Sequence, residues 1–121
     1  MLIKLFNFNF TFIYINCIGG IFWIMDDRDY MVMLYDFYGE LFNDKQREYF
    51  EEYYFQNLSL AEISINFGVS RNAVHKTIQG VEEKLRFYEG KLKLYEKNKK
   101  ILNIIENTSD IELRKVLEGL V

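Results

Sequence analysis

The sequence predicts an all-α protein, a helix-turn-helix domain with a long C-terminal extension of the recognition helix. Residues 58–78 contain two short helical patterns joined by a turn at Gly68, Val69 and Ser70, which is the arrangement of a helix-turn-helix. Apolar residues recur at helical spacing from Tyr30 almost to the end of the chain. Proline is absent, so no residue forbids long helices.

The first 24 residues differ from the remainder. Their Phe residues alternate with Asn or Thr, as in a strand, and Lys4 is their only charge. Three interpretations are open: a membrane anchor or signal peptide, which the Asn residues interrupt, an edge strand beside a helical domain, and a mis-assigned start. The last is favoured, because most of these residue types have codons of A and T only and Gly19-Gly20 is compatible with a ribosome-binding sequence before Met25. Peptides from residues 1–24 in the native protein would contradict it.

The first helix of the domain is expected over residues 29–39, with Gly39 as its stop signal. Its buried stripe should consist of Tyr30, Met33, Leu34, Phe37 and Leu41. Asn43 can cap a second helix, with Gln46 in the capping-box position. The inner face of this second helix should be aromatic, with Tyr49, Phe50, Tyr53 and Tyr54.

The helix-turn-helix is predicted to place helices at residues 59–67 and from Ser70 onward. Ser59 can cap the first helix while Glu62 closes a capping box, and Ser70 can cap the second. Gly68 supplies the residue that tolerates positive φ in the turn. The small residues where the helices cross are Ala61 and Ser64, and the apolar residues that lock the pair are Ile63, Phe67, Val69, Val74 and Ile78.

A heptad pattern continues beyond the expected recognition helix. Its apolar positions are Val74, Ile78, Val81, Leu85, Tyr88, Leu92, Tyr95 and Leu102. Gly80 and Gly90 interrupt it at outward positions, each weakening the helix by about 1 kcal/mol, which allows a bend or break near either. Two interpretations are open for this stripe: it packs on the chain's own first helices, or it forms a dimer seam. The positions assigned to the core or dimer stripe are Val81, Leu85, Tyr88, Leu92 and Tyr95.

A final short helix is expected over residues 110–120, started by Ser109 with Glu112. The expected organisation is therefore a helix-turn-helix domain with its long helix over residues 25–106 and a short C-terminal helix within residues 107–121.

Catalysis has little support in the sequence. His75 and Cys17 are the only histidine and cysteine, so clustered metal ligands, disulfides and Cys/His nucleophile pairs are poorly supported. No glycine-rich phosphate loop occurs either. We expect no catalytic residue, no metal and no cofactor, and hence a protein that is not an enzyme.

Charge is distributed unevenly along the chain. The net charge is −3, whereas a strongly basic domain is the usual sign of nucleic-acid binding. Between residues 84 and 100, however, seven Lys or Arg residues face only two Glu residues. This basic run is either a solvated face or a surface that follows phosphates, and its candidate residues are Lys84, Arg86, Lys91 and Lys93.

Residues of the types that reach base edges and phosphates occupy the expected recognition helix, off its apolar stripe. They are Arg71, Asn72, His75, Lys76 and Gln79. The spacing suits a nucleic-acid groove. A helix-turn-helix can instead serve purely to bind another protein, and the modest charge leaves that alternative open.

Two resemblances extend these inferences. Leu60, Glu62 and Ile63, followed by the run 67–71, resemble the promoter-reading helix-turn-helix of bacterial sigma factors. With the blocks 34–38, 41–47 and 94–97 in the same order, residues 30–100 resemble the YlxM-like family of small bacterial helix-turn-helix proteins. This second resemblance implies a cytoplasmic, all-helical, dimeric protein encoded beside signal recognition particle genes. It implies a role in that pathway or in its regulation. The expected partners are DNA or structured RNA, or a signal recognition particle protein or RNA, and no membrane.

Overall fold

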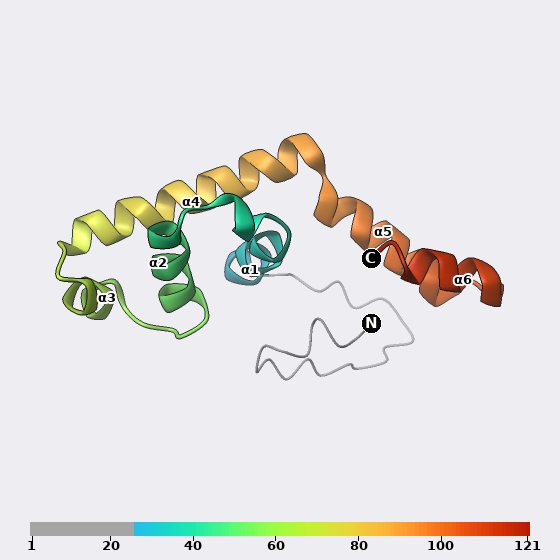
Figure 1. The fold of residues 1–121 in the computed structure, drawn as a ribbon, viewed down its shortest axis with the longest axis horizontal. Helices are drawn as coiled ribbons and strands as arrows, with labels where there is room; N and C mark the ends of the chain where they lie inside the picture. The colour runs from blue at the N-terminus through green and yellow to red at the C-terminus, as the bar shows by residue number, and fades with distance from the viewer. Residues whose placement is uncertain (1–25) are drawn as a thin grey trace. The chain divides into compact units, whose positions relative to one another are not determined.

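The computed structural model describes residues 26–121, which form six α-helices and one short 3-10 helix (Figure 1). No strand occurs among these residues, which confirms the predicted all-α class for the part of the chain described. Residues 1–24, with their alternating Phe pattern, lie outside it. None of the described helices is long and apolar enough to cross a membrane.

The elements divide between two compact units. In chain order they are α1 (Asp27–Tyr38), η2 (Gly39–Leu41), α2 (Asp44–Tyr54), α3 (Leu60–Phe67), α4 (Arg71–Leu92), α5 (Leu94–Asn107) and α6 (Ile111–Glu118). One unit comprises residues 25–100, and residues 101–121 belong to the other, so the boundary falls within α5.

The first unit is organised around α4. Helices α1, α2 and α3 lie along one side of it (Figure 1), and side chains from all four helices fill a single core. From α4 this core takes Val74, Ile78, Val81 and Leu85, none of which is more than 3% exposed. This part of the apolar stripe therefore packs on the chain's own helices.

Helix α1 is rotated relative to the prediction. It begins at Asp27 because the Asp26 side chain caps it by accepting the Arg28 backbone N–H. Its buried residues are Met31, Leu34, Tyr35 and Tyr38. The predicted stripe was wrong at Leu41, which is 59% exposed. Because α1 ends at Tyr38, Leu41 lies in the following 3-10 turn and no longer shares the helix's inner face.

Gly39 ends α1 as predicted, for a packing reason. Its φ is −56°, which any residue adopts. A Cβ at this position would lie 3.0 Å from the ring of Tyr35. The missing side chain leaves room for that ring, which stacks on Phe50 with centroids 4.3 Å apart.

The predicted helix starts around the turn are confirmed. Asn43 and Gln46 form a capping box at α2, and Ser59 and Glu62 form another at α3. Ser70 caps α4 by accepting the Ala73 N–H. Gly68 has a φ of 64°, the left-handed conformation that the turn requires.

The long helix breaks at Lys93, three residues after Gly90. Lys93 has a φ of 55° and separates α4 from α5, so the heptad pattern does not form one continuous helix. Glu89 is 7% exposed, and its carboxylate accepts the backbone N–H groups of Tyr95 and Glu96. Glu89 therefore caps the helix that begins after the break.

The C-terminal helix starts one residue later than predicted. Its cap is Asp110, whose Oδ1 accepts the N–H groups of Glu112 and Leu113 at 3.0 and 3.1 Å. Ser109 does not cap it, since Asp110 occupies the flanking position and its carboxylate reaches both donors.

Candidate nucleic-acid interface

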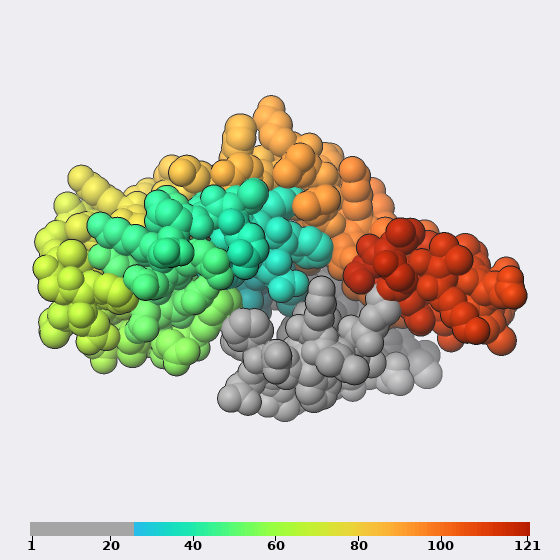
Figure 2. All heavy atoms as spheres, viewed as in Figure 1, coloured from blue at the N-terminus to red at the C-terminus, as the bar shows by residue number. Residues whose placement is uncertain are grey.

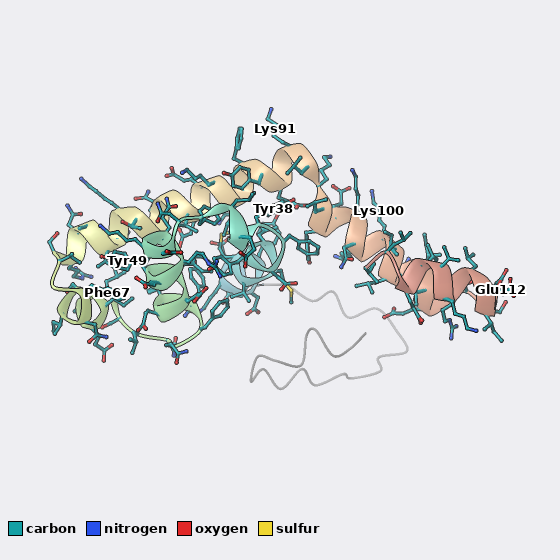
Figure 3. All side chains as sticks on the ribbon, viewed as in Figure 1. Tyr38, Tyr49, Phe67, Lys91, Lys100 and Glu112 are labelled. Atoms are coloured by element: carbon teal, nitrogen blue, oxygen red, sulfur yellow. The ribbon has the colours of Figure 1, made fainter. Side chains whose placement is uncertain are left out.

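Hydrogen bonds and ring packing around the turn set the direction in which α4 starts. The Gly68 N–H donates to the carbonyl of Ile65, and the Val69 N–H donates to the carbonyl of Ser64 at 3.1 Å. At the end of α3 the ring of Phe67 meets the ring of Tyr49 edge to face, with centroids 4.8 Å apart (Figure 3). These contacts hold the first turn of α4 in a set direction relative to α2 and α3.

The five predicted recognition residues in the first turns of α4 are all exposed. Since Val74 and Ile78 are buried, the 100° step per residue places Asn72, Lys76 and Gln79 on the opposite side of the helix. Arg71 and His75 flank them and are also exposed. The structure thus brings the five predicted recognition residues onto one accessible surface.

A shallow cavity lies at one edge of this surface. Its volume is about 350 Å³, and it is lined by Leu60 from α3 and by Arg71, Asn72 and His75 from α4. Within residues 26–121, no hydrogen bond or ion pair engages the Arg71, Asn72, His75 or Lys76 side chains. Their donors are therefore available to phosphates and base edges.

The capping residue Glu62 places a negative charge at the start of α3. The backbone N–H and the hydroxyl of Ser59 donate to Glu62, each at 2.8 Å. These bonds hold the pKa of Glu62 below its usual value, so this carboxylate stays ionised beside the recognition surface. The negative charge lies at the N-terminal end of α3, where it interacts favourably with the helix dipole.

The basic run is divided between two sides of α4. Lys84 and Arg86 are two residues apart, so they point about 160° away from each other around the helix axis. Lys91 lies on the side of Lys84, and Lys93 lies at the break. The basic run therefore does not form a single positive stripe along this helix.

Ion pairs occupy part of the basic run. Arg86 binds both carboxylate oxygens of Asp27, at 2.7 and 2.9 Å, which ties the middle of α4 to the start of α1. Lys93 lies 3.7 Å from Glu96, and Lys100 lies 2.9 Å from the same residue. Lys84 and Lys91 make no ion pair within residues 26–121, which leaves them as the more accessible cations of this set.

The residues assigned to the core or dimer stripe have different environments. Val81 and Leu85 are fully buried, and Tyr88 and Tyr95 are half-buried against the core. Leu92 is 48% exposed. Of these residues only Leu92 keeps about half of its surface available for another chain.

Two notable residues were not predicted from the sequence. Glu89 was counted as a surface charge, but it falls four residues after Leu85 and hence on the buried side of α4. That spacing was the available signal. Phe87, which is 59% exposed, lies outside the heptad pattern and was not singled out.

Within residues 26–121 there is no cluster of three or more His, Cys, Asp or Glu side chains that could hold a metal ion.

Comparison with known proteins gives one family. A family model described as "Putative helix-turn-helix protein, YlxM / p13 like" matches residues 25–119. A UPF0122 protein of Thermoanaerobacter sp. (strain X514) is 41% identical over 106 residues, covering 78% of this chain and 91% of the relative. A UPF0122 protein of Oceanobacillus iheyensis is 43% identical over 83 residues, covering 69% of this chain and 79% of the relative. A UPF0122 protein of Ureaplasma urealyticum serovar 10 is 40% identical over 93 residues, covering 77% of this chain and 94% of the relative.

Proposed function

Because the chain belongs to the YlxM/p13-like family of helix-turn-helix proteins, we propose that it is a non-enzymatic protein that binds nucleic acid through the first turns of α4. The observation that carries this proposal is the accessible surface of Arg71, Asn72, His75, Lys76 and Gln79. In helix-turn-helix proteins the start of the second helix contacts base edges in the major groove.

The side chains suit that role chemically. Arg donates two parallel hydrogen bonds to guanine, Asn and Gln pair with adenine, and Lys binds guanine or backbone phosphates. Lys84 and Lys91 then contribute contacts to phosphates further along the ligand, and these contacts add affinity without sequence preference.

A regulatory role linked to the signal recognition particle, in the cytoplasm and as a homodimer, completes the proposal. It rests on the family resemblance. The nucleic acid is then genomic DNA near the genes that the protein regulates, or the RNA of the particle.

The second candidate is a module that binds a protein component of that pathway. Ile65 on α3 favours it, because this apolar side chain is 79% exposed. Exposed apolar side chains of this kind contribute to protein interfaces more than to phosphate binding.

Fluorescence anisotropy with genomic DNA fragments and with signal recognition particle RNA, across a salt series, tests the proposal. Replacing Arg71, Asn72, His75 and Lys76 by Ala should reduce discrimination between sequences. Replacing Lys84 and Lys91 by Ala should weaken all binding alike and flatten the salt dependence by roughly one unit of slope for each phosphate that is no longer bound. Lys45→Ala, an exposed lysine on α2, is the matched control and should change neither.

Two results would decide against nucleic-acid binding. The first is wild-type binding no tighter than the roughly 10⁻⁴–10⁻⁶ M of non-specific association at physiological salt. The second is retention of the same protein partners from native lysate after nuclease treatment, which would favour the protein-binding module.

A further inference from the structure

Phe87 is the most exposed aromatic ring of the described chain, at 59%. Among residues 26–121, its ring contacts one other ring, that of Tyr88, edge to face with centroids 6.0 Å apart. A single exposed apolar side chain is ordinary by itself. The surroundings of this ring are what distinguish it.

Two lysines flank the ring. The Lys91 ammonium lies 5.8 Å from the centroid of the Phe87 ring, one helical turn further along α4. Figure 3 shows Lys91 extending away from the ribbon near the end of this helix, and atoms of the same part of the chain project from the surface in Figure 2. Lys84 lies one turn before Phe87 on the same side. Glu83 also lies one turn before Phe87, and its carboxylate balances only one of the two lysine charges.

Glycines lie on either side of the ring along the helix. Gly80 precedes Phe87 by about two turns on nearly the same line, and Gly90 follows it by about one turn. A Cβ added at either glycine would meet nothing within 4 Å. The packing of this chain therefore does not require glycine there, although glycine weakens a helix interior. The bare backbone leaves room for a flat group to approach the Phe87 ring.

We propose that Phe87 is a stacking platform for an unpaired base of a folded RNA, and that Lys84 and Lys91 bind the phosphates on either side of that base. Exposed aromatic rings beside cations bind single-stranded nucleic acid in this way, because every base offers a π-face and every nucleotide a phosphate. Folded RNA presents unpaired bases in loops and bulges, whereas duplex DNA keeps its bases paired and stacked.

This inference rests on the proposed function and narrows its ligand. Phe87 lies on the same side of α4 as Lys76, 11 residues further along, which is about 16 Å of helix. One RNA can therefore place the phosphates and wide minor groove of a base-paired stem against the first turns of α4, and an unpaired base against Phe87.

The test uses the full chain and three probes: a hairpin RNA with 2-aminopurine unpaired in its loop, a blunt RNA duplex of the same stem, and single-stranded DNA of the loop sequence. Wild-type protein should bind the hairpin more tightly than the other two and quench the 2-aminopurine fluorescence. Phe87→Leu keeps an apolar side chain but removes the aromatic face, so it should lose the quench and about tenfold in affinity. Phe87→Trp should keep both.

Leu41→Ala is the control, because Leu41 is 59% exposed like Phe87 but offers no ring. It should bind the hairpin as wild type does. Hairpin binding by Phe87→Leu at wild-type affinity would overturn the stacking site and leave the proposed function standing. Equal affinity for the single-stranded DNA would overturn the assignment to RNA, and hairpin binding by wild type without any fluorescence change would overturn stacking. Failure of every nucleic acid to bind wild type would instead refute the proposed function.

Discussion

The hydroxyl of Tyr38 on α1 donates a 2.6 Å hydrogen bond to Glu89 on α4, the one charged residue that is buried among those described. The same hydroxyl oxygen accepts the N–H of Leu94 at 3.1 Å. Tyr38 and Glu89 together therefore satisfy the first N–H groups of α5. This pair joins the first helix of the domain to the point where the long helix breaks.

Removing the Tyr38 hydroxyl should destabilise the domain. Tyr38→Phe leaves the Glu89 carboxylate with one donor fewer in a buried site, which should lower the free energy of unfolding by about 1–3 kcal/mol. Urea denaturation followed by circular dichroism measures it. Tyr35→Phe is the control, because its partner Glu51 is half-exposed and also lies 3.8 Å from Arg47. A loss at Tyr38 no larger than the loss at Tyr35 would contradict the role assigned to this pair.

The same pair predicts a loss of stability in alkali. Burial and the hydrogen bond to Glu89 raise the pKa of Tyr38 from 10.0 to about 12. Because the Tyr38 pKa is higher in the folded than in the unfolded protein, the stability that this hydroxyl contributes is complete below pH 10. It is lost progressively as the pH rises toward 12, since the unfolded chain then gives up the proton more readily. Between about pH 9 and about pH 12, the urea midpoint should therefore fall less for Tyr38→Phe than for wild type. Burial also raises the pKa values of Tyr35 and Tyr54, so some decline should remain in the variant. Parallel declines in the two proteins would count against the prediction.

The turn of the helix-turn-helix should not tolerate a side chain. Gly68 has a φ of 64°, and a β-branched residue in this conformation is strained, so Gly68→Val should lower stability by about 1–3 kcal/mol. Gly80→Ala is the opposite case, because this glycine lies inside α4 with open space around it. It should raise stability by up to about 1 kcal/mol. Thermal scans of both variants check the pair, and a Gly68→Val melting temperature equal to wild type would refute the strain at this turn.

The proposed homodimer should depend on Leu92 and cannot be tested at Leu85. Leu85 is fully buried in the chain's own core, so Leu85→Asp should unfold the protein instead of separating subunits. Leu92 is 48% exposed, so Leu92→Asp should leave the fold intact and shift the population toward monomer, if this residue lies in the seam. Light scattering at tens of micromolar, roughly the range for a modest interface, measures it. A wild-type protein that remains monomeric there would exclude the dimer.

Local signals in the sequence determined the helix-turn-helix. The capping boxes at Asn43 and Ser59 and the cap at Ser70 join residues three apart, and the positive φ of Gly68 depends on its own lack of a side chain. Such features are readable without knowledge of the fold, because each involves atoms that are neighbours along the chain. The exposure of the recognition residues follows in the same way from the apolar spacing of Val74 and Ile78.

Only the tertiary structure decided where the long helix ends and which partners its charged side chains bind. The carboxylate that caps α5 is held by Tyr38, which lies 51 residues earlier in the chain, and Arg86 is drawn to Asp27, 59 residues away. Helical spacing cannot reveal these contacts, because it describes one helix at a time and does not say which helix packs on which face. The break at Lys93 and the burial of Glu89 against Tyr38 were decided by that packing.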